Sequence, residues 1–261
     1  MKQLDRLKQL RKDILRVSNQ GKDGNLQSCF SSLEILWTLY NDILCLTPET
    51  LKLPEHDRFV LSKGQSNLAL MAVLAEKGFI PRKELSTFCQ FDSRVSMQAD
   101  RTKFEGFIET SAGSLGHGFP MAVGMAWAAK IKGSPERIFV LTGDGELNEG
   151  TIWEAAIFAS SENLKNLVLI IDDNHSVDRM LCVGSWEEKF KAFGFSVTNV
   201  DGHNCIELIK ELQKKADSPK AIIAKTQRGY GSRTLMNDPS WFHRWPTDEE
   251  LQILLTEVDE F

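Results

Sequence analysis

With 261 residues, 42% of them apolar, the chain is long enough to bury a substantial core and fits one large α/β domain better than two small ones. Its 31 Lys and Arg residues against 36 Asp and Glu residues give a formal net charge of -5. No global basic field therefore attracts nucleic acid or an anionic membrane, so neither partner is expected. Any phosphate group that the protein binds must be held by a local site.

Nothing in the sequence predicts export or membrane insertion. Residues 1–18 alternate charged residues with leucine and lack the continuous apolar run of a secretory signal. No later segment reaches the roughly 18 apolar residues of a membrane span. The five cysteines are scattered without a CxxC pair, which favours reduced structural thiols. A cytoplasmic location is the simplest expectation.

The first part of the chain is typical of helices. Apolar residues recur at helical spacing over residues 2–18, which predicts an amphipathic helix. Two more helices are expected over Ser32–Asn41 and Ser66–Lys77. A long irregular stretch is then expected up to Ala112.

Helices and short apolar runs alternate in the second half of the chain. Strands are expected at Ile138–Leu141, Leu167–Ile171, Phe195–Val200 and Ala221–Ala224, and helices at Pro120–Lys130, Gly150–Ser161, Asn204–Lys215 and after Pro246. This alternation is the pattern of parallel strands joined by crossover helices. The sequence therefore predicts an α/β fold, a parallel sheet flanked by helices on both faces.

Two polar clusters follow strands of the predicted sheet. Gly143-Asp144-Gly145-Glu146 comes after the strand that ends at Leu141, and Asp172-Asp173-Asn174 comes directly after the strand that ends at Ile171. Ligands of open parallel sheets bind beyond the carboxyl ends of the strands, where helix N-termini present unpaired amides. We expect the two clusters to lie side by side at that edge.

The residue types in these clusters suit the capture of a diphosphate through a divalent cation. Mg2+, or Ca2+ or Mn2+ in its place, prefers oxygen ligands, and Mg2+ usually takes only one or two protein groups besides phosphate and water. Asp144 can supply a carboxylate and Asn174 a carbonyl oxygen. The metal would offset the repulsion between Asp144 and phosphate. The alternative is ordinary turn capping by Asp and Asn.

Four segments, in order, resemble the transketolase family of thiamin diphosphate enzymes. GDGELNEGTIWEAA, with Asn174 thirty residues after Asp144, is similar to the family's diphosphate motif. FVLSKGQSNLALMAVLAEKGF, GSLGHGFPMAVGMA and IIAKTQRGYG are similar to its FVLSKGH, GPLGQG and IIAKTxKGxG segments. The resemblance covers most of the chain and implies a thiamin diphosphate-binding fold of the diphosphate-binding type, with thiamin diphosphate and Mg2+ as cofactors.

The resemblance also implies residue roles. The metal ligands would be Asp144, Asn174 and the backbone carbonyl of Ser176, and the residues that contact the cofactor would be Gly113, Ser114, Leu115, Gly145, Glu149 and Gln65. Glu149 resembles a glutamate that faces its symmetry mate at a subunit interface, and Glu154 belongs to the same acidic network.

Glu149, His117 and His243 are the candidates for a catalytic role. A histidine in a loop is more often a surface or packing residue, and that alternative stays open for His117 and His243. Glu149 has the alternative of a solvated residue that the dipole of a helix N-terminus favours. Lys63 and Lys225, at strand ends, could attract phosphate, with ordinary solvated lysines as the alternative.

The chain departs from the family at its histidines. The GHPG motif aligns with residues 24–27, which puts Asn25 in the place of the histidine, and Gln65 replaces the histidine of SKGH. The family's Trp-His pair is Trp241-Phe242 here, with His243 one place later. Amides hydrogen-bond a hydroxyl but cannot exchange a proton near neutral pH as imidazole does. Our hypothesis is a ketol-transfer scaffold whose donor is a modified sugar or a 2-oxoacid.

The family's second domain, which binds the aminopyrimidine, would need several hundred residues beyond Phe261. The resemblance therefore implies that residues 1–261 form a single diphosphate-binding domain and that a separate C-terminal transketolase-like subunit carries the pyrimidine site. A heterotetramer that self-associates through the cofactor-binding domain is expected.

The predicted reaction moves a two-carbon ketol or acyl unit from a ketose or 2-oxoacid to an aldehyde. Two alternatives stay open. One is a subunit of a thiamin diphosphate-dependent decarboxylating carboligase, and the other is a noncatalytic regulatory or stabilising subunit.

Overall fold

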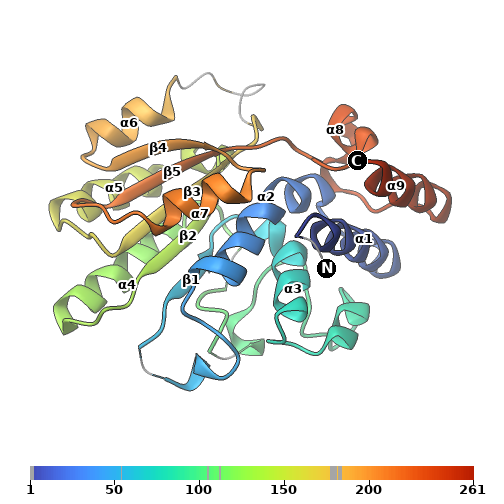
Figure 1. The fold of residues 1–261 in the computed structure, drawn as a ribbon, viewed down its shortest axis with the longest axis horizontal. Helices are drawn as coiled ribbons and strands as arrows, with labels where there is room; N and C mark the ends of the chain where they lie inside the picture. Colours follow the sequence, from blue (N-terminus) through green and yellow to red (C-terminus); the bar gives the residue numbers. More distant parts are fainter. Residues whose placement is uncertain (1–2, 54, 105, 112, 177–180, 182–183) are drawn as a thin grey trace.

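Five parallel strands form one sheet in the order β1-β2-β3-β5-β4 (Figure 1). The computed structural model describes residues 3–53, 55–104, 106–111, 113–176, 181 and 184–261. The strands are β1 Arg58–Leu61, β2 Ile138–Gly143, β3 Leu167–Asp173, β4 Ser196–Asp201 and β5 Lys220–Lys225. The α-helices are α1 Gln3–Gly21, α2 Leu26–Thr38, α3 Asn67–Glu76, α4 Gly118–Lys132, α5 Gly150–Ser161, α6 Trp186–Ala192, α7 Cys205–Gln213, α8 Arg233–Asn237 and α9 Asp248–Glu260.

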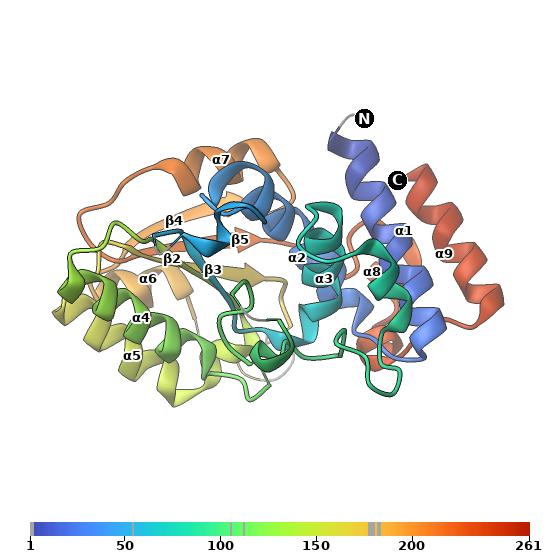
Figure 2. The same cartoon turned by 90° about the horizontal axis from the view of Figure 1, so that it is seen from below.

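Helices cover both faces of the sheet because its central strands are apolar on both sides. In β2, Phe139 and Leu141 belong to one core and Ile138 and Val140 to the other. Every residue of β2 and β3 is buried, as expected for central strands of a parallel sheet. Helices α4, α5 and α6 pack on one face, and α2 and α7 on the other (Figures 1 and 2).

A separate group of helices lies beyond the carboxyl ends of the strands. Figure 2 shows α1, α3, α8 and α9 on that side, with α1 packed against α9. Helix α2 contacts α1, α3 and α7, so it links this group to the sheet. The strand tips therefore face the N-terminal part of α2 and not open solvent. Within the described part of the chain, no helix has both the length and the apolarity to cross a membrane.

The predicted fold class is confirmed, whereas several element boundaries differ from the prediction. Strands β2 and β3 each run two residues further than expected, to Gly143 and Asp173, because the next strand still offers ladder partners there. The prediction that the second helix starts at Ser32 was wrong. It starts at Leu26, because the side-chain oxygen of Asn25 accepts a hydrogen bond from the Ser28 N–H and caps it. The sequence did not predict β1, α6 or α8.

Candidate functional site

The two polar clusters meet at the tips of β2 and β3. These strands pair in parallel with Gly143 opposite Asp172, and the Asp144 N–H donates to the Asp172 carbonyl at 3.1 Å. Asp144 and Asp172 are both fully buried. The predicted juxtaposition of the clusters is therefore present in the fold.

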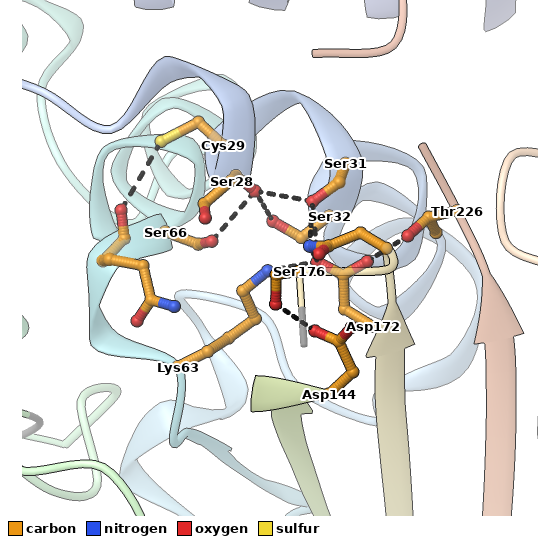
Figure 3. A network of polar contacts seen from close by, with 12 residues as sticks. Ser28, Cys29, Ser31, Ser32, Lys63, Ser66, Asp144, Asp172, Ser176 and Thr226 are labelled. Atoms are coloured by element: carbon orange, nitrogen blue, oxygen red, sulfur yellow. Dashed lines mark hydrogen bonds and ion pairs between the residues drawn. The ribbon is translucent and has the colours of Figure 1, made fainter. Parts of the chain in front are cut away.

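Asp144 is bonded to the loop that follows β3. Its Oδ1 accepts from the hydroxyl of Ser176 at 2.5 Å and from the N–H of Gly145 at 2.9 Å (Figure 3). Ser176 lies two residues after Asn174, so the three predicted metal ligands come from one short stretch and the adjacent strand tip. The hydroxyl of Ser176 makes this contact, whereas the prediction concerned its carbonyl.

Asn174 presents a buried oxygen that lacks a donor. Its side-chain nitrogen donates to Ser31 Oγ and to Asp172 Oδ2, both at 3.2 Å, while its Oδ1 has no hydrogen-bond partner among the residues that the structure describes. A buried acceptor without a partner costs about 1–3 kcal/mol. A bound cation would remove that cost, so the amide fits the predicted role of metal ligand.

The predicted ligand set contains only one carboxylate. Among the described residues, no three His, Cys, Asp or Glu side chains form a group that could hold a metal ion. A site of one carboxylate with amide and backbone oxygens leaves room for the phosphate oxygens and waters that Mg2+ usually retains. The donor chemistry therefore fits Mg2+ bound together with a diphosphate.

Asp172 is the centre of a buried polar network (Figure 3). Lys63, whose side chain is 1% exposed, forms an ion pair with its Oδ2, and Ser31 Oγ donates to the same oxygen at 2.7 Å. Thr226 Oγ1 donates to Oδ1. Burial by itself raises the pKa of Asp172, but the positive charge of Lys63 and the hydrogen bonds from Lys63, Thr226 and Ser31 outweigh burial and lower it. Asp172 is therefore an ionised, structural carboxylate.

Glu146 anchors the predicted cofactor loop. Its Oε1 accepts from the Ser62 hydroxyl and, at 2.8 Å, from the N–H of Gly116, which directly follows Gly113-Ser114-Leu115. Its Oε2 is buried without a partner in the described part of the chain, and burial raises the pKa of Glu146. The loop is therefore tied to the segment that carries Asp144.

Gly116 is the tight point of this loop. Its φ is +82°, and a Cβ there would lie 2.5 Å from Cβ of Glu149, so only glycine fits. Thr151 Oγ1 donates to the Gly116 carbonyl at 2.7 Å. Gly113 and Ser114 themselves are exposed and Leu115 is half-buried, which leaves the loop open to a ligand.

A cavity of about 540 Å³ lies beside Asn174. Its described lining comes from Gln27 on α2, from residues 174–176 after β3, from residues 226–228 after β5, and from Met236, Asn237 and Pro239. This described lining contains no carboxylate, and Arg228 brings a positive charge, with its Nη2 donating to Gln27 Oε1 at 2.8 Å. Arg228 lies in a segment that resembles the family, but no role was predicted for it from the sequence.

The remaining candidate residues lie around this site at different distances. His117 is exposed, with its Nδ1 3.1 Å from the Leu115 carbonyl. Glu149 is exposed at the start of α5. Gln65 is half-buried in the turn Gly64–Ser66. His243 is 62% exposed, with its Nε2 3.7 Å from Asp23 Oδ1, and it is not part of the cavity lining. Their predicted roles stay predictions.

Helices α4 and α5 expose apolar side chains next to the site. The exposed residues of this α4–α5 surface are Met121, Gly124, Trp127, Ala128 and Ile131 on α4 and Ile157 and Phe158 on α5. Trp127 packs edge-on against Phe158, with ring centroids 5.4 Å apart. An exposed cluster of large apolar side chains is uncommon on a monomer, so this surface is suited to a protein partner.

Comparison with known proteins gives concordant matches. Residues 2–250 match the family described as "Transketolase, thiamine diphosphate binding domain". An apulose-4-phosphate transketolase subunit from Actinobacillus succinogenes is 35% identical over 257 residues, which is 96% of this chain and 93% of that protein. The 6-deoxy-6-sulfo-D-fructose transketolase subunit SqwG of Clostridium sp. strain MSTE9 is 36% identical over 217 residues, 80% of this chain and 78% of that protein.

The fold has solved relatives as well. The transketolase from Leishmania mexicana superimposes with a TM-score of 0.86 at 25% sequence identity. The match covers 99% of this chain but only 41% of the Leishmania chain. This chain therefore spans less than half of that enzyme and nearly all of the Actinobacillus protein.

Proposed function

Since the chain belongs to the transketolase family through its thiamin diphosphate-binding domain, we propose that it is the diphosphate-binding subunit of a two-component ketol transferase. The observation that carries this proposal is the buried oxygen of Asn174, which lacks a donor and lies beside the Asp144–Ser176 pair. Most buried acceptors are hydrogen-bonded, and this one lies at the strand tips where a cation can satisfy it.

The residues present would hold Mg2+ and the diphosphate together. Asp144, the Asn174 oxygen and the Ser176 carbonyl would bind the metal, and Gly145 with the loop of residues 113–115 would contact the cofactor. Arg228 in the cavity wall adds a positive charge that favours a phosphate group. When bound, thiamin diphosphate supplies the ring that stabilises a carbanion while a carbon–carbon bond breaks and forms. This chain's part is to anchor the cofactor and to neutralise its charge.

We propose that a separate subunit supplies the pyrimidine-binding domain. The support is the match over 93% of the Actinobacillus protein, whose name makes it one subunit of a transketolase, and the match to only 41% of the Leishmania transketolase. One chain of each kind, doubled through the diphosphate-binding domains, gives the heterotetramer expected above. The partner gene product should resemble the part of transketolase that this chain does not match.

The α4–α5 surface is the proposed contact between two copies of this chain. It is apolar, and Glu149 and Glu154 lie exposed at the N-terminal half of α5 beside it. The change Ile157→Glu, at a side chain 55% exposed, should halve the mass of the assembly measured by light scattering. Ile206→Glu, at a side chain 77% exposed on α7, is the matched control and should leave the mass unchanged. Equal masses for both variants and the parent would contradict this contact.

The proposed donor is a modified sugar. Two relatives carry apulose-4-phosphate and 6-deoxy-6-sulfo-D-fructose in their names. In this chain, amides stand where the family resemblance places histidines, and Asn25 is almost fully buried as a helix cap. Its side chain is therefore occupied by the backbone and has little freedom to move a proton.

The test combines this chain with its partner subunit, thiamin diphosphate and Mg2+, and measures adduct formation from a panel of donors. The panel contains xylulose 5-phosphate, apulose 4-phosphate, 6-deoxy-6-sulfofructose and pyruvate. We expect adduct formation to be fastest with a modified sugar. A rate with xylulose 5-phosphate equal to that with any other donor would exclude the substrate proposal. Adduct formation from pyruvate alone would favour a decarboxylating carboligase over a ketol transferase.

A further inference from the structure

Asp172 ends β3 beside Asp144, yet it is not available to a ligand. Both of its oxygens accept hydrogen bonds from the protein: Oδ1 from Thr226, and Oδ2 from Lys63, Ser31 and Asn174. The side chain has no measurable exposure. Burying a carboxylate and an ammonium together is costly, and apolar residues of similar size often serve stability as well or better. The pair therefore calls for a reason other than stability.

The reason lies in the side-chain amide of Asn174, whose nitrogen donates hydrogen bonds and whose oxygen accepts them. The two ends of a carboxamide have nearly the same size, so the neighbouring groups decide which end points where. An ionised carboxylate only accepts hydrogen bonds, so Asp172 selects the nitrogen end of Asn174. Ser31 favours the same choice, because it donates to Asp172 at 2.7 Å and can then accept from the Asn174 nitrogen at 3.2 Å. No described residue donates to the oxygen end.

Lys63 fixes Asp172 in place from the opposite side. It follows β1, and β2 lies between β1 and β3, so the ion pair reaches across the tip of β2. Figure 3 shows the Lys63 side chain directed at Asp172, with Ser31 on α2 and Thr226 after β5 around the same carboxylate. Residues from two strand tips and one helix thus converge on the Asp172 carboxylate, which holds the amide of Asn174.

We propose that Asp172, held by Lys63 and Ser31, is a positioning residue that locks the side chain of Asn174 with its oxygen free for the cation. The inference rests on the proposed function, since it concerns how this chain prepares that metal site. None of the three residues touches the metal in this account. Their effect is on the affinity for the metal, because without them the amide rotates between two orientations and only one can bind.

Two neighbouring serines of α2 provide a matched test. Ser31 and Ser32 are both fully buried, and both donate to the Ser28 carbonyl, at 3.1 and 2.8 Å. Only Ser31 also contacts Asp172 and Asn174. In the full chain bound to its partner subunit and thiamin diphosphate, Ser31→Ala should lower Mn2+ affinity about 10-fold, as loss of a residue behind a metal ligand typically does. Ser32→Ala should match the parent. The readout is the Mn2+ electron paramagnetic resonance signal, not turnover.

A second variant removes the charges and keeps the shape. Lys63→Met with Asp172→Asn replaces the ion pair by neutral groups, so the fold should survive, while residue 172 can offer either end of an amide to Asn174. Mn2+ affinity should fall about 10- to 100-fold, with the circular dichroism spectrum of the parent. Parent-like affinity in this variant and in Ser31→Ala would overturn the positioning role.

Asn174→Ala separates this inference from the proposed function. If Asn174→Ala loses Mn2+ while Ser31→Ala and the double variant bind like the parent, the metal site stands and the positioning role is wrong. If Asn174→Ala itself binds Mn2+ like the parent, the metal assignment fails and the positioning role fails with it.

Discussion

The two ends of the parallel sheet treat their charges differently. At the amino end, Arg58 pairs with Glu109 and Glu136, and its side chain is 28% exposed, while Arg137, 36% exposed, pairs with Asp57. At the carboxyl end, Lys63 and Asp172 are almost completely withdrawn from water. A partly hydrated ion pair changes the free energy of unfolding little. A fully buried pair is costly to form, and removing one of its partners costs still more stability.

Hydrogen bonding distinguishes the same two ends. Both oxygens of Asp57 accept hydrogen bonds, from Arg137 and from the Cys45 N–H at 2.8 Å. At the carboxyl end, the Asn174 Oδ1 and the Glu146 Oε2 are buried without a partner among the described residues. Buried atoms without a described partner also occur near the amino end, on Tyr40 beside Phe59 and on Glu211. The unsatisfied oxygens at the carboxyl end differ in that they lie in the segments next to Asp144. These oxygens cost some stability because they lack a donor, which is the arrangement expected where a ligand binds.

Removing one cation at each end tests this difference most strongly. Lys63→Met should lower the free energy of unfolding by about 3–5 kcal/mol, because it leaves the carboxylate of Asp172 buried without its charge partner. Arg58→Met should cost about 1 kcal/mol or less, because water already screens that pair. Urea denaturation of both variants at neutral pH measures the two effects. Equal losses would show that the two ends do not differ in the way described.

The sequence predicted that the proposed metal ligands lie side by side, but it did not predict the buried ion pair that supports them. Asp144 and Asn174 each sit just beyond an apolar run, and parallel strands bring their carboxyl ends together whatever the rest of the fold does. Lys63 reads as an ordinary lysine at a strand end. Its burial depends on Asp172, 109 positions away, and on β1, a four-residue strand too short to stand out as a pattern.

Residues in loops were the other limit of sequence reasoning. Gln27 and Arg228 join in the cavity wall although 201 positions separate them, and no local spacing indicates that contact. The long loops around the site also decide where His243 points, and its contact with Asp23 comes from another part of the chain. Regular elements place the proposed metal ligands, whereas loop packing sets the wall of the cavity.

Removing a carboxylate from the same edge should separate binding from folding. Asp144→Ala should weaken Mg2+-dependent binding of thiamin diphosphate at least about 100-fold, or about 3 kcal/mol, with little change in stability. The matched control is Asp173→Asn at the tip of β3, whose carboxylate pairs with the half-exposed Lys225. Isothermal titration calorimetry on both variants gives the comparison. Cofactor binding that falls equally in the two would indicate a general effect of charge at this edge and would remove the special role of Asp144.

The smallest effect concerns the pH dependence that Glu146 adds. Burial raises the pKa of Glu146 in the folded state, so between the ordinary glutamate value and this raised value the folded protein binds more protons than the unfolded chain. Stability therefore falls as pH rises through that window, and the loss is complete above the raised pKa. Glu146→Gln cannot ionise, so relative to the parent it should gain on the order of 1 kcal/mol from acidic to neutral pH.

Glu34 on α2 provides the opposite case for that measurement. Burial raises its pKa, but Arg11 and His203 outweigh burial and lower it, so its ionised form stabilises the fold above the ordinary glutamate value. Glu34→Gln should therefore lose stability relative to the parent as pH rises from acidic to neutral. Unfolding curves at several pH values should give slopes of opposite sign for the two variants. Slopes of the same sign would mean that Lys63 and the hydrogen bonds to Glu146 outweigh its burial and lower its pKa in place of raising it.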